Sequence, residues 1–195
     1  MSDRTRVELT IHACPPEQAQ AVIDLIEQHN LHPEYDEESI PGDDVLALGL
    51  PYMDNEITCG SAPEISKDIQ AAAPGASFRV HEDPFGSWLG STHLFTPELG
   101  ELSLLCESGG DPVFRGEDVL QMLDTLGRNE LEKALGLTHT KALIEILQNA
   151  EGPTNSTGDY VIIAPPANQH SWRRAVAEGK TELGLTDCVT QQATP

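Results

Sequence analysis

Lysine and arginine are almost absent from the first half of this 195-residue chain. Neither occurs between Arg6 and Lys67, where thirteen Asp and Glu are found, and from Val7 to Phe114 twenty acids face two bases, Lys67 and Arg79. The whole chain has 32 acids against 11 bases, a formal net charge of −21. Such a field repels nucleic acids and anionic membranes and attracts cations and basic protein surfaces. The charge therefore argues against direct binding to nucleic acid.

Several signatures of known site types are absent as well. There is no Gly-x-Gly-x-x-Gly, no phosphate-binding loop and no His-Glu-x-x-His, so nucleotide and metalloprotease chemistry lack their usual residues. The four cysteines form no Cys-x-x-Cys pair, which for a cytosolic chain predicts buried thiols and not a zinc site. We therefore expect no cofactor and no metal, and the absences favour a binding protein over an enzyme.

Long apolar runs are missing too. No stretch reaches the length of a membrane span, and the polar N-terminus leads into an alternating segment and not into a signal-peptide core. We expect a cytoplasmic protein with no membrane contact. Aromatic residues make up only 5% of the chain, so the core must depend on Leu, Ile, Val and Ala.

The hydrophobic pattern predicts alternating strands and helices. Residues 7–12 alternate as a half-buried strand does, and residues 17–29 carry one apolar stripe, as an amphipathic helix does. Residues 45–50 and 56–59 are predicted strands, with a turn at Asp54 and Asn55. Ser61 and Glu64 form a capping-box pattern that predicts a helix to residue 73, and residues 76–81 form the next predicted strand.

The order of these elements predicts an α+β fold with a ferredoxin-like, split β-α-β antiparallel sheet. Residues 88–95 and 101–107 are expected to extend the sheet as a meander. We divide the chain into an α+β sheet domain (1–114), a helical segment (115–150), and a linker with a short strand and a C-terminal helix and tail (151–195).

A dense run of acids falls in the predicted loop before residue 45. Pro33, Pro41 and Gly42 mark the loop, and its like charges argue for exposure to solvent. The run lacks the one-three-five spacing and the glycine of an EF-hand calcium loop. We predict that it contacts the basic surface of another protein through five residues, Asp36, Glu37, Glu38, Asp43 and Asp44.

A second candidate site lies in residues 78–90, where aromatic and charged residues meet. Strand alternation directs Phe78 and Val80 to one face of the sheet, and Arg79 and His81 to the other. Convergent polar groups beside an aromatic wall are typical of a ligand pocket. The predicted pocket residues are Arg79, His81, Glu82 and Trp88.

One resemblance rests on motifs spread over the middle of the chain. The motifs are Cys59-Gly60-Ser61-Ala62, Ala73-Pro74, Glu82-Asp83-Pro84 with Trp88-Leu89-Gly90, Thr96-Pro97-Glu98-Leu99-Gly100, and Cys106 before Gly110-Asp111-Pro112-Val113. In these the chain resembles an uncharacterised family of small acidic proteins from actinobacteria and their phages and plasmids. The resemblance implies no activity, but a mobile-element setting favours proteins that bind and block a host protein.

Three functions remain as alternatives. The favoured one is an acidic interaction protein, in the extreme case a DNA mimic that inhibits a DNA-binding or host-defence protein, because carboxylates can occupy sites built for phosphates. The second is a small enzyme or ligand-binding module with a pocket near Arg79, His81 and Trp88. The third is a structural or regulatory homo-oligomer that uses the helices after Arg115. Acidity that serves solubility alone is the alternative to the first.

Overall fold

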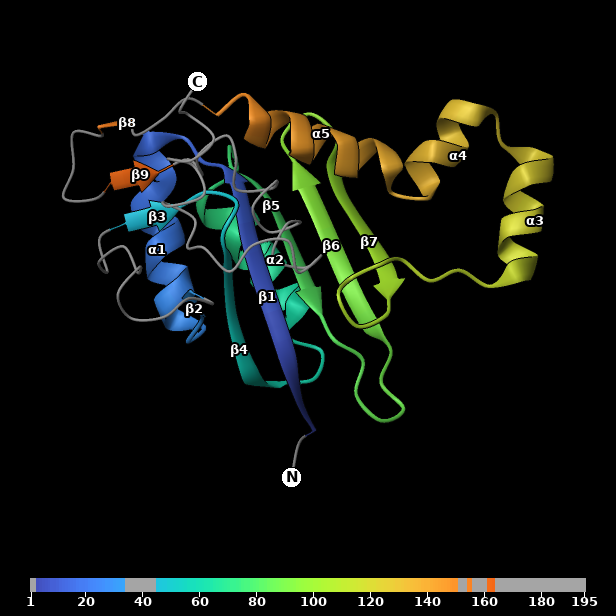
Figure 1. Ribbon diagram of the computed structural model, residues 1–195, viewed down its shortest axis with the longest axis horizontal. Coiled ribbons are helices and arrows are strands. Elements are labelled where there is room, and N and C mark those ends of the chain that lie inside the picture. The colour runs from blue at the N-terminus through green and yellow to red at the C-terminus, as the bar shows by residue number, and fades with distance from the viewer. Residues whose placement is uncertain (1–2, 34–44, 151–153, 156–160, 164–195) are drawn as a thin grey trace, which may run out of the picture.

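The computed structural model describes residues 3–33, 45–150, 154–155 and 161–163. Within these ranges the fold is α+β, with five α-helices and a six-stranded antiparallel sheet (Figure 1). The strands are β1 (Arg4–Ala13), β2 (His32–Pro33), β3 (Val45–Ala47), β4 (Pro51–Thr58), β5 (Ser77–Glu82), β6 (Gly90–Thr96), β7 (Gly100–Cys106), β8 (Thr154–Asn155) and β9 (Val161–Ile163). The helices are the short 3-10 helix η1 (Pro16–Gln18), α1 (Ala19–Gln28), α2 (Ala62–Ala72), α3 (Gly116–Thr125), α4 (Arg128–Ala134) and α5 (Leu137–Gln148).

The main sheet has the strand order β2-β4-β1-β5-β6-β7. Every neighbouring pair in it is antiparallel. The strands β5, β6 and β7 are consecutive in the chain and adjacent in the sheet, so the predicted meander is confirmed. None of the helices in the described part of the chain is both long and apolar enough to cross a bilayer.

One face of the main sheet carries the core, and α1 and α2 cover it. We call it the helix face. Its buried side chains include Val7, Leu9 and Ile11 of β1, which alternate with partly exposed residues as the sequence predicts. Phe78 and Val80 of β5 are fully buried beside them. Burial of this apolar surface is the main source of folding free energy.

The opposite face of the sheet carries Glu8 and Thr10 of β1 and Arg79 and His81 of β5, and we call it the polar face. Register places Glu8 opposite His81, and Thr10 opposite Arg79. Helix α5 crosses one end of the strands, while α4 and α3 extend beyond β7 (Figure 1). The His12 ring lies 3.1 Å from the carbonyl oxygen of Leu143, which ties α5 to β1 on this face.

The prediction that residues 45–50 form a strand of the main sheet is wrong. Only Val45–Ala47 is a strand, and it pairs in parallel with β9 in a small second sheet, β3-β9-β8. Gly49 has φ 73°, which turns the chain, and its N–H donates to the Ile11 carbonyl. The run is apolar because Leu46, Ala47 and Leu48 are buried in the core. The expected turn at Asp54 and Asn55 lies inside β4, which is the true neighbour of β1.

We expect Phe78→Ala to lower the free energy of unfolding by about 3–5 kcal/mol, because it leaves a cavity in the core. The Phe78 side chain is fully buried and stacks on Phe95 with ring centroids 5.3 Å apart. Phe85→Ala is the matched control, since Phe85 is 49% exposed. Denaturant unfolding measures both variants, and equal losses would contradict the assigned core.

Candidate functional site

The Gly109-Gly110 turn, which follows β7, contacts the Arg79 side chain directly. The Arg79 Nη2 group donates to the Gly109 carbonyl oxygen at 2.8 Å. Gly110 has φ +82°, and a Cβ built on it would lie 1.8 Å from Arg79 Nη2 and 3.2 Å from His81 Cγ. The left-handed backbone angle favours glycine at this position, and any side chain there would also displace the Arg79 guanidinium. The Gly109-Gly110 turn thus covers the polar face at Arg79 and His81.

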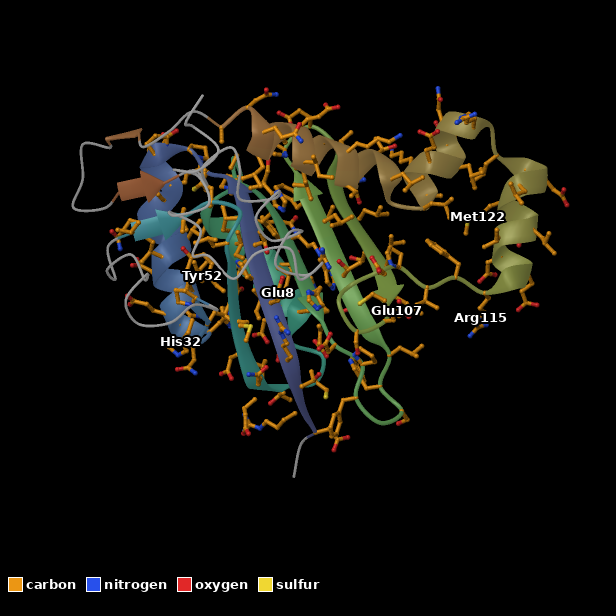
Figure 2. The ribbon with its side chains drawn as sticks, viewed as in Figure 1. Glu8, His32, Tyr52, Glu107, Arg115 and Met122 are labelled. Carbon is orange, nitrogen blue, oxygen red and sulfur yellow. The ribbon has the colours of Figure 1, made fainter. Side chains whose placement is uncertain are left out.

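His81 is buried and lies among charged groups. Its Nε2 is 3.3 Å from Asp83 Oδ1, and Asp83 also accepts the Gly109 N–H at 3.2 Å. Burial, followed by the charge of Arg79, lowers the pKa of His81, although Glu8 and Asp83 act in the opposite direction. The imidazole is therefore neutral at neutral pH. Glu8, near the middle of the sheet in Figure 2, is itself paired with Arg6 at 2.8 Å.

Thr92 of β6 completes this group of side chains. It is 1% exposed and lies directly opposite His81 in the β5-β6 pair, so both side chains are on the polar face. Sequence reasoning missed Thr92, Asp83 and the Gly109-Gly110 turn as site residues. The Gly109-Gly110 pair in the sequence does indicate a turn. That Thr92 lies opposite His81 depends on strand register, which the sequence pattern does not determine.

Glu82, also predicted for the pocket, lies on the helix face and has a structural task. It is fully buried, and its Oε1 and Oε2 accept the N–H groups of Gly60 at 2.6 Å and Ala62 at 3.1 Å. A carboxylate at the first turn of a helix satisfies free N–H groups and complements the helix dipole. The capping box predicted from Ser61 and Glu64 is not formed, since the Ser61 hydroxyl donates to the Thr58 carbonyl. Glu82 supplies the missing acceptor from β5.

Trp88 belongs to the same region as Glu82 and not to the polar face. Phe85 and Trp88 exchange two backbone hydrogen bonds across a tight turn. A Cβ on Gly60 would lie 3.3 Å from Trp88 Cζ2, so the indole ring rests against the backbone that Glu82 holds. The structure therefore divides the predicted pocket. Arg79 and His81 lie together on the polar face, while Glu82 and Trp88 meet near the start of α2.

The predicted partner contact lies outside the part of the chain that the structure describes. Asp36, Glu37, Glu38, Asp43 and Asp44 all lie outside the described residues. They connect β2 to β3 along the sequence. Their proposed role therefore depends on their charge and spacing alone.

A polar cluster joins α2 to β6 and β7 on the helix face, in which Ser66 and His93 are buried while Glu101 and Ser103 are exposed. His93 Nδ1 lies 3.0 Å from Glu101 Oε1 and 2.9 Å from Ser103 Oγ, and Ser66 donates to Glu101 at 2.9 Å. A nucleophilic triad needs the acid and the serine on different ring nitrogens. Here both face Nδ1, so the cluster is not arranged for acyl transfer. Burial raises the pKa of Glu101, but hydrogen bonds from Ser66 and His93 outweigh it and lower the pKa below its usual value.

Cys106 lies near Arg79 and carries a thiol, a group that can act as a nucleophile. This thiol is protonated at neutral pH. Burial raises the pKa of its thiol to about 11, and the thiol donates to the Glu82 carbonyl at 3.6 Å. A protonated thiol is a poor nucleophile. Among the residues that the structure describes, no three His, Cys, Asp or Glu side chains are grouped so that they could hold a metal ion.

We expect Glu82→Ala to destabilise the fold by about 2–5 kcal/mol, because it leaves two buried N–H groups without acceptors. Glu82→Gln keeps an acceptor oxygen but loses the charge, so its loss should be smaller. Glu98→Ala removes an exposed carboxylate and serves as the control. Thermal or denaturant unfolding measures the three. Equal stability of Glu82→Ala and the control would refute the capping role.

The free energy of unfolding should fall as the pH drops below about 6.5, the pKa of histidine in an unfolded chain. Burial is the largest cause that lowers the pKa of both His81 and His139. Between about pH 6.5 and their folded pKa values, the unfolded chain binds more protons, so stability rises with pH. Replacing both histidines with glutamine should flatten this slope in denaturant titrations at about pH 7.5 and 5.5. An unchanged slope would contradict the assignment.

Comparison with known proteins adds nothing to this geometry. No protein-family model matches the chain, and neither a curated protein nor a solved structure is significantly similar to it. The resemblance to small acidic proteins of actinobacteria and their mobile elements stays a prediction. The functional argument therefore depends on the residues of this chain alone.

Proposed function

We propose that the protein is an acidic interaction protein that presents carboxylates to the basic surface of another protein. The observation that carries the proposal is the lack of neutralising bases around exposed acids. Glu17 before α1, Glu27 on α1 and Glu64 on α2 are exposed. None of them forms an ion pair within the described part of the chain. Such carboxylates are available for charge-assisted hydrogen bonds to Lys and Arg of a partner.

Helix α3 supplies an apolar surface next to further acids. Leu120 is 65% exposed and Leu123 is 56% exposed, and no residue of α3 is buried. Met122 points from α3 toward the sheet (Figure 2), and Leu120, two residues earlier and therefore about 200° around the helix, faces away from the sheet. An apolar stripe left exposed on a helix is typical of a protein-binding surface. A second copy is disfavoured as its occupant, because two chains of charge −21 repel each other.

The strongest form of the proposal is a DNA mimic, encoded by a phage or mobile element, that inhibits a DNA-binding or host-defence protein. Carboxylates on a rigid scaffold can occupy positions that a DNA-binding protein provides for phosphates. We also propose a cytoplasmic location. Cys14, Cys59 and Cys106 are free thiols in the described part of the chain, as is usual in a reducing compartment.

We infer in addition that the β1 to β5 part is ferredoxin-like. Three observations support the inference. The four strands have the order β2-β4-β1-β5, α1 connects β1 to β2, and α2 connects β4 to β5. Both helices contribute to the same core on the helix face. A sheet of this kind holds its outer helical surface rigid, which suits a surface of fixed charges.

We expect reversal of Asp36, Glu37, Asp43 and Asp44 to lysine to abolish capture of a basic partner while the fold is kept. The measurement is affinity capture from host lysate at low and at high salt, because exposed ion pairs weaken as salt rises. In the DNA-mimic form, added duplex DNA should displace the captured protein.

The matched control reverses four exposed acids to which the proposal gives no role, Glu56, Glu98, Glu107 and Glu145, and gives the same net charge. This control should keep the partner. If both variants failed to capture the partner, only net charge would matter. If the variant with Asp36, Glu37, Asp43 and Asp44 reversed still captured the partner, the proposed contact would be refuted.

A further inference from the structure

Three buried polar atoms on the polar face have no hydrogen-bond partner within the described part of the chain. They are Arg79 Nε, His81 Nδ1 and Thr92 Oγ1. His81 is 3% exposed and Thr92 is 1% exposed. The two are opposite each other across β5 and β6, and Arg79 is two residues before His81 on the same face. Since nearly all buried polar groups in proteins are hydrogen-bonded, three such atoms in one patch need a physical reason.

The charge of Arg79 points to the kind of group that would satisfy them. In a chain with 32 acids and 11 bases, this half-buried guanidinium forms no ion pair with any described residue, and it donates a hydrogen bond to the neutral Gly109 carbonyl. Of the neighbouring carboxylates, Glu8 pairs with Arg6, and Asp83 lies beside the His81 ring and accepts the Gly109 N–H, so neither forms an ion pair with Arg79. Charges removed from water are normally paired, so an uncompensated guanidinium favours an anion.

We propose that Arg79, His81 and Thr92 form a binding site for a small oxyanion that also carries a hydroxyl group, covered by the Gly109-Gly110 turn. The Arg79 Nε–H and the Thr92 hydroxyl donate to the anionic oxygens, and guanidinium suits carboxylate and phosphate geometry. His81 donates from Nε2 to Asp83, which leaves Nδ1 as an acceptor for the ligand hydroxyl. A singly protonated phosphate and a 2-hydroxy acid share this chemistry.

The Gly109-Gly110 turn accounts for the burial of the site, and its movement would give a ligand access to it. Two hydrogen bonds join the Gly109-Gly110 turn to the site, from Arg79 to the Gly109 carbonyl and from the Gly109 N–H to Asp83, while the Gly110 and Glu107 N–H groups close the turn itself through the carbonyls of Glu107 and Asp111. Both glycines have positive φ, +93° and +82°. Breaking the two bonds to Arg79 and Asp83 would separate the turn from the site while its own hydrogen bonds stay formed, so a small ligand can enter without unfolding of the sheet.

The first test is calorimetric titration with inorganic phosphate, lactate and acetate at constant ionic strength, with sodium chloride as the blank. Phosphate and lactate should bind, and acetate, which lacks the hydroxyl, should bind more weakly. Arg79→Met should weaken binding by about tenfold or more, the effect of one charged hydrogen bond. Lys67→Met removes the same charge from an exposed position on α2 and should bind as the wild type does.

Thr92→Val separates a binding role from a structural one. Because the hydroxyl has no partner in the described structure, its removal should leave the melting temperature unchanged or raise it, while binding of phosphate or lactate weakens several-fold. A hydroxyl with only a structural role would instead lower the melting temperature.

Gly110→Ala and Gly109→Ala form the second matched pair. A methyl group at position 110 would enter the space beside Arg79 and His81, whereas one at position 109 would meet nothing within 4 Å. Both changes strain the backbone, but only Gly110→Ala should abolish binding. The proposal is overturned if neither phosphate nor lactate binds the wild type more tightly than chloride, or if Arg79→Met and Thr92→Val bind as the wild type does.

Discussion

Strand β5 lies between β1 and β6, and the alternation of its side chains decides what each face of the sheet contains. Phe78, Val80 and Glu82 turn toward α1 and α2, where the first two fill the core and the third holds the start of α2. Arg79 and His81 turn the other way. A slip of one residue in register would exchange these sets, burying a guanidinium in the core and exposing Phe78. The fold and the candidate ligand site thus depend on the same pairing.

The features of the fold that the sequence predicts correctly are those that depend on residues close together in the chain. The alternation in residues 7–12 and the apolar stripe of α1 are visible in sequence, and the structure confirms the strand and the helix there. The opposite faces of Phe78 and Arg79 also follow from strand alternation. The pairing of Thr92 with His81 does not, because it joins residues through register. The Glu82 cap does not either, because its acceptor comes from a strand twenty residues after Ala62.

The error at residues 45–50 has the same origin. An apolar run reports burial, and Leu46 is indeed fully buried. It does not report which strand lies beside it. The polar pair Asp54-Asn55 predicts a turn, but one side of β4 faces solvent and tolerates these residues within a strand. Long-range pairing outweighed local turn propensity, as is common in sheets.

The two proposed activities act over different distances. The surface carboxylates create a long-range field that steers basic partners and repels anions, whereas Arg79 acts only within contact distance. A small oxyanion would have to approach against that field. Its binding would therefore tighten as salt screens the surface, while binding of a basic partner would weaken.

Because α3 lies outside the sheet and the core, the backbone could be cut there with little loss of packing. The residues before α3 are anchored by β7 in the sheet, and those after it by α5 on β1 and β6. No side chain of α3 is buried, so α3 itself adds little to either anchor. A single backbone cut within α3 would therefore leave two fragments bound to one sheet. The protein is in this sense a natural candidate for fragment complementation, with the break placed between two independently anchored parts.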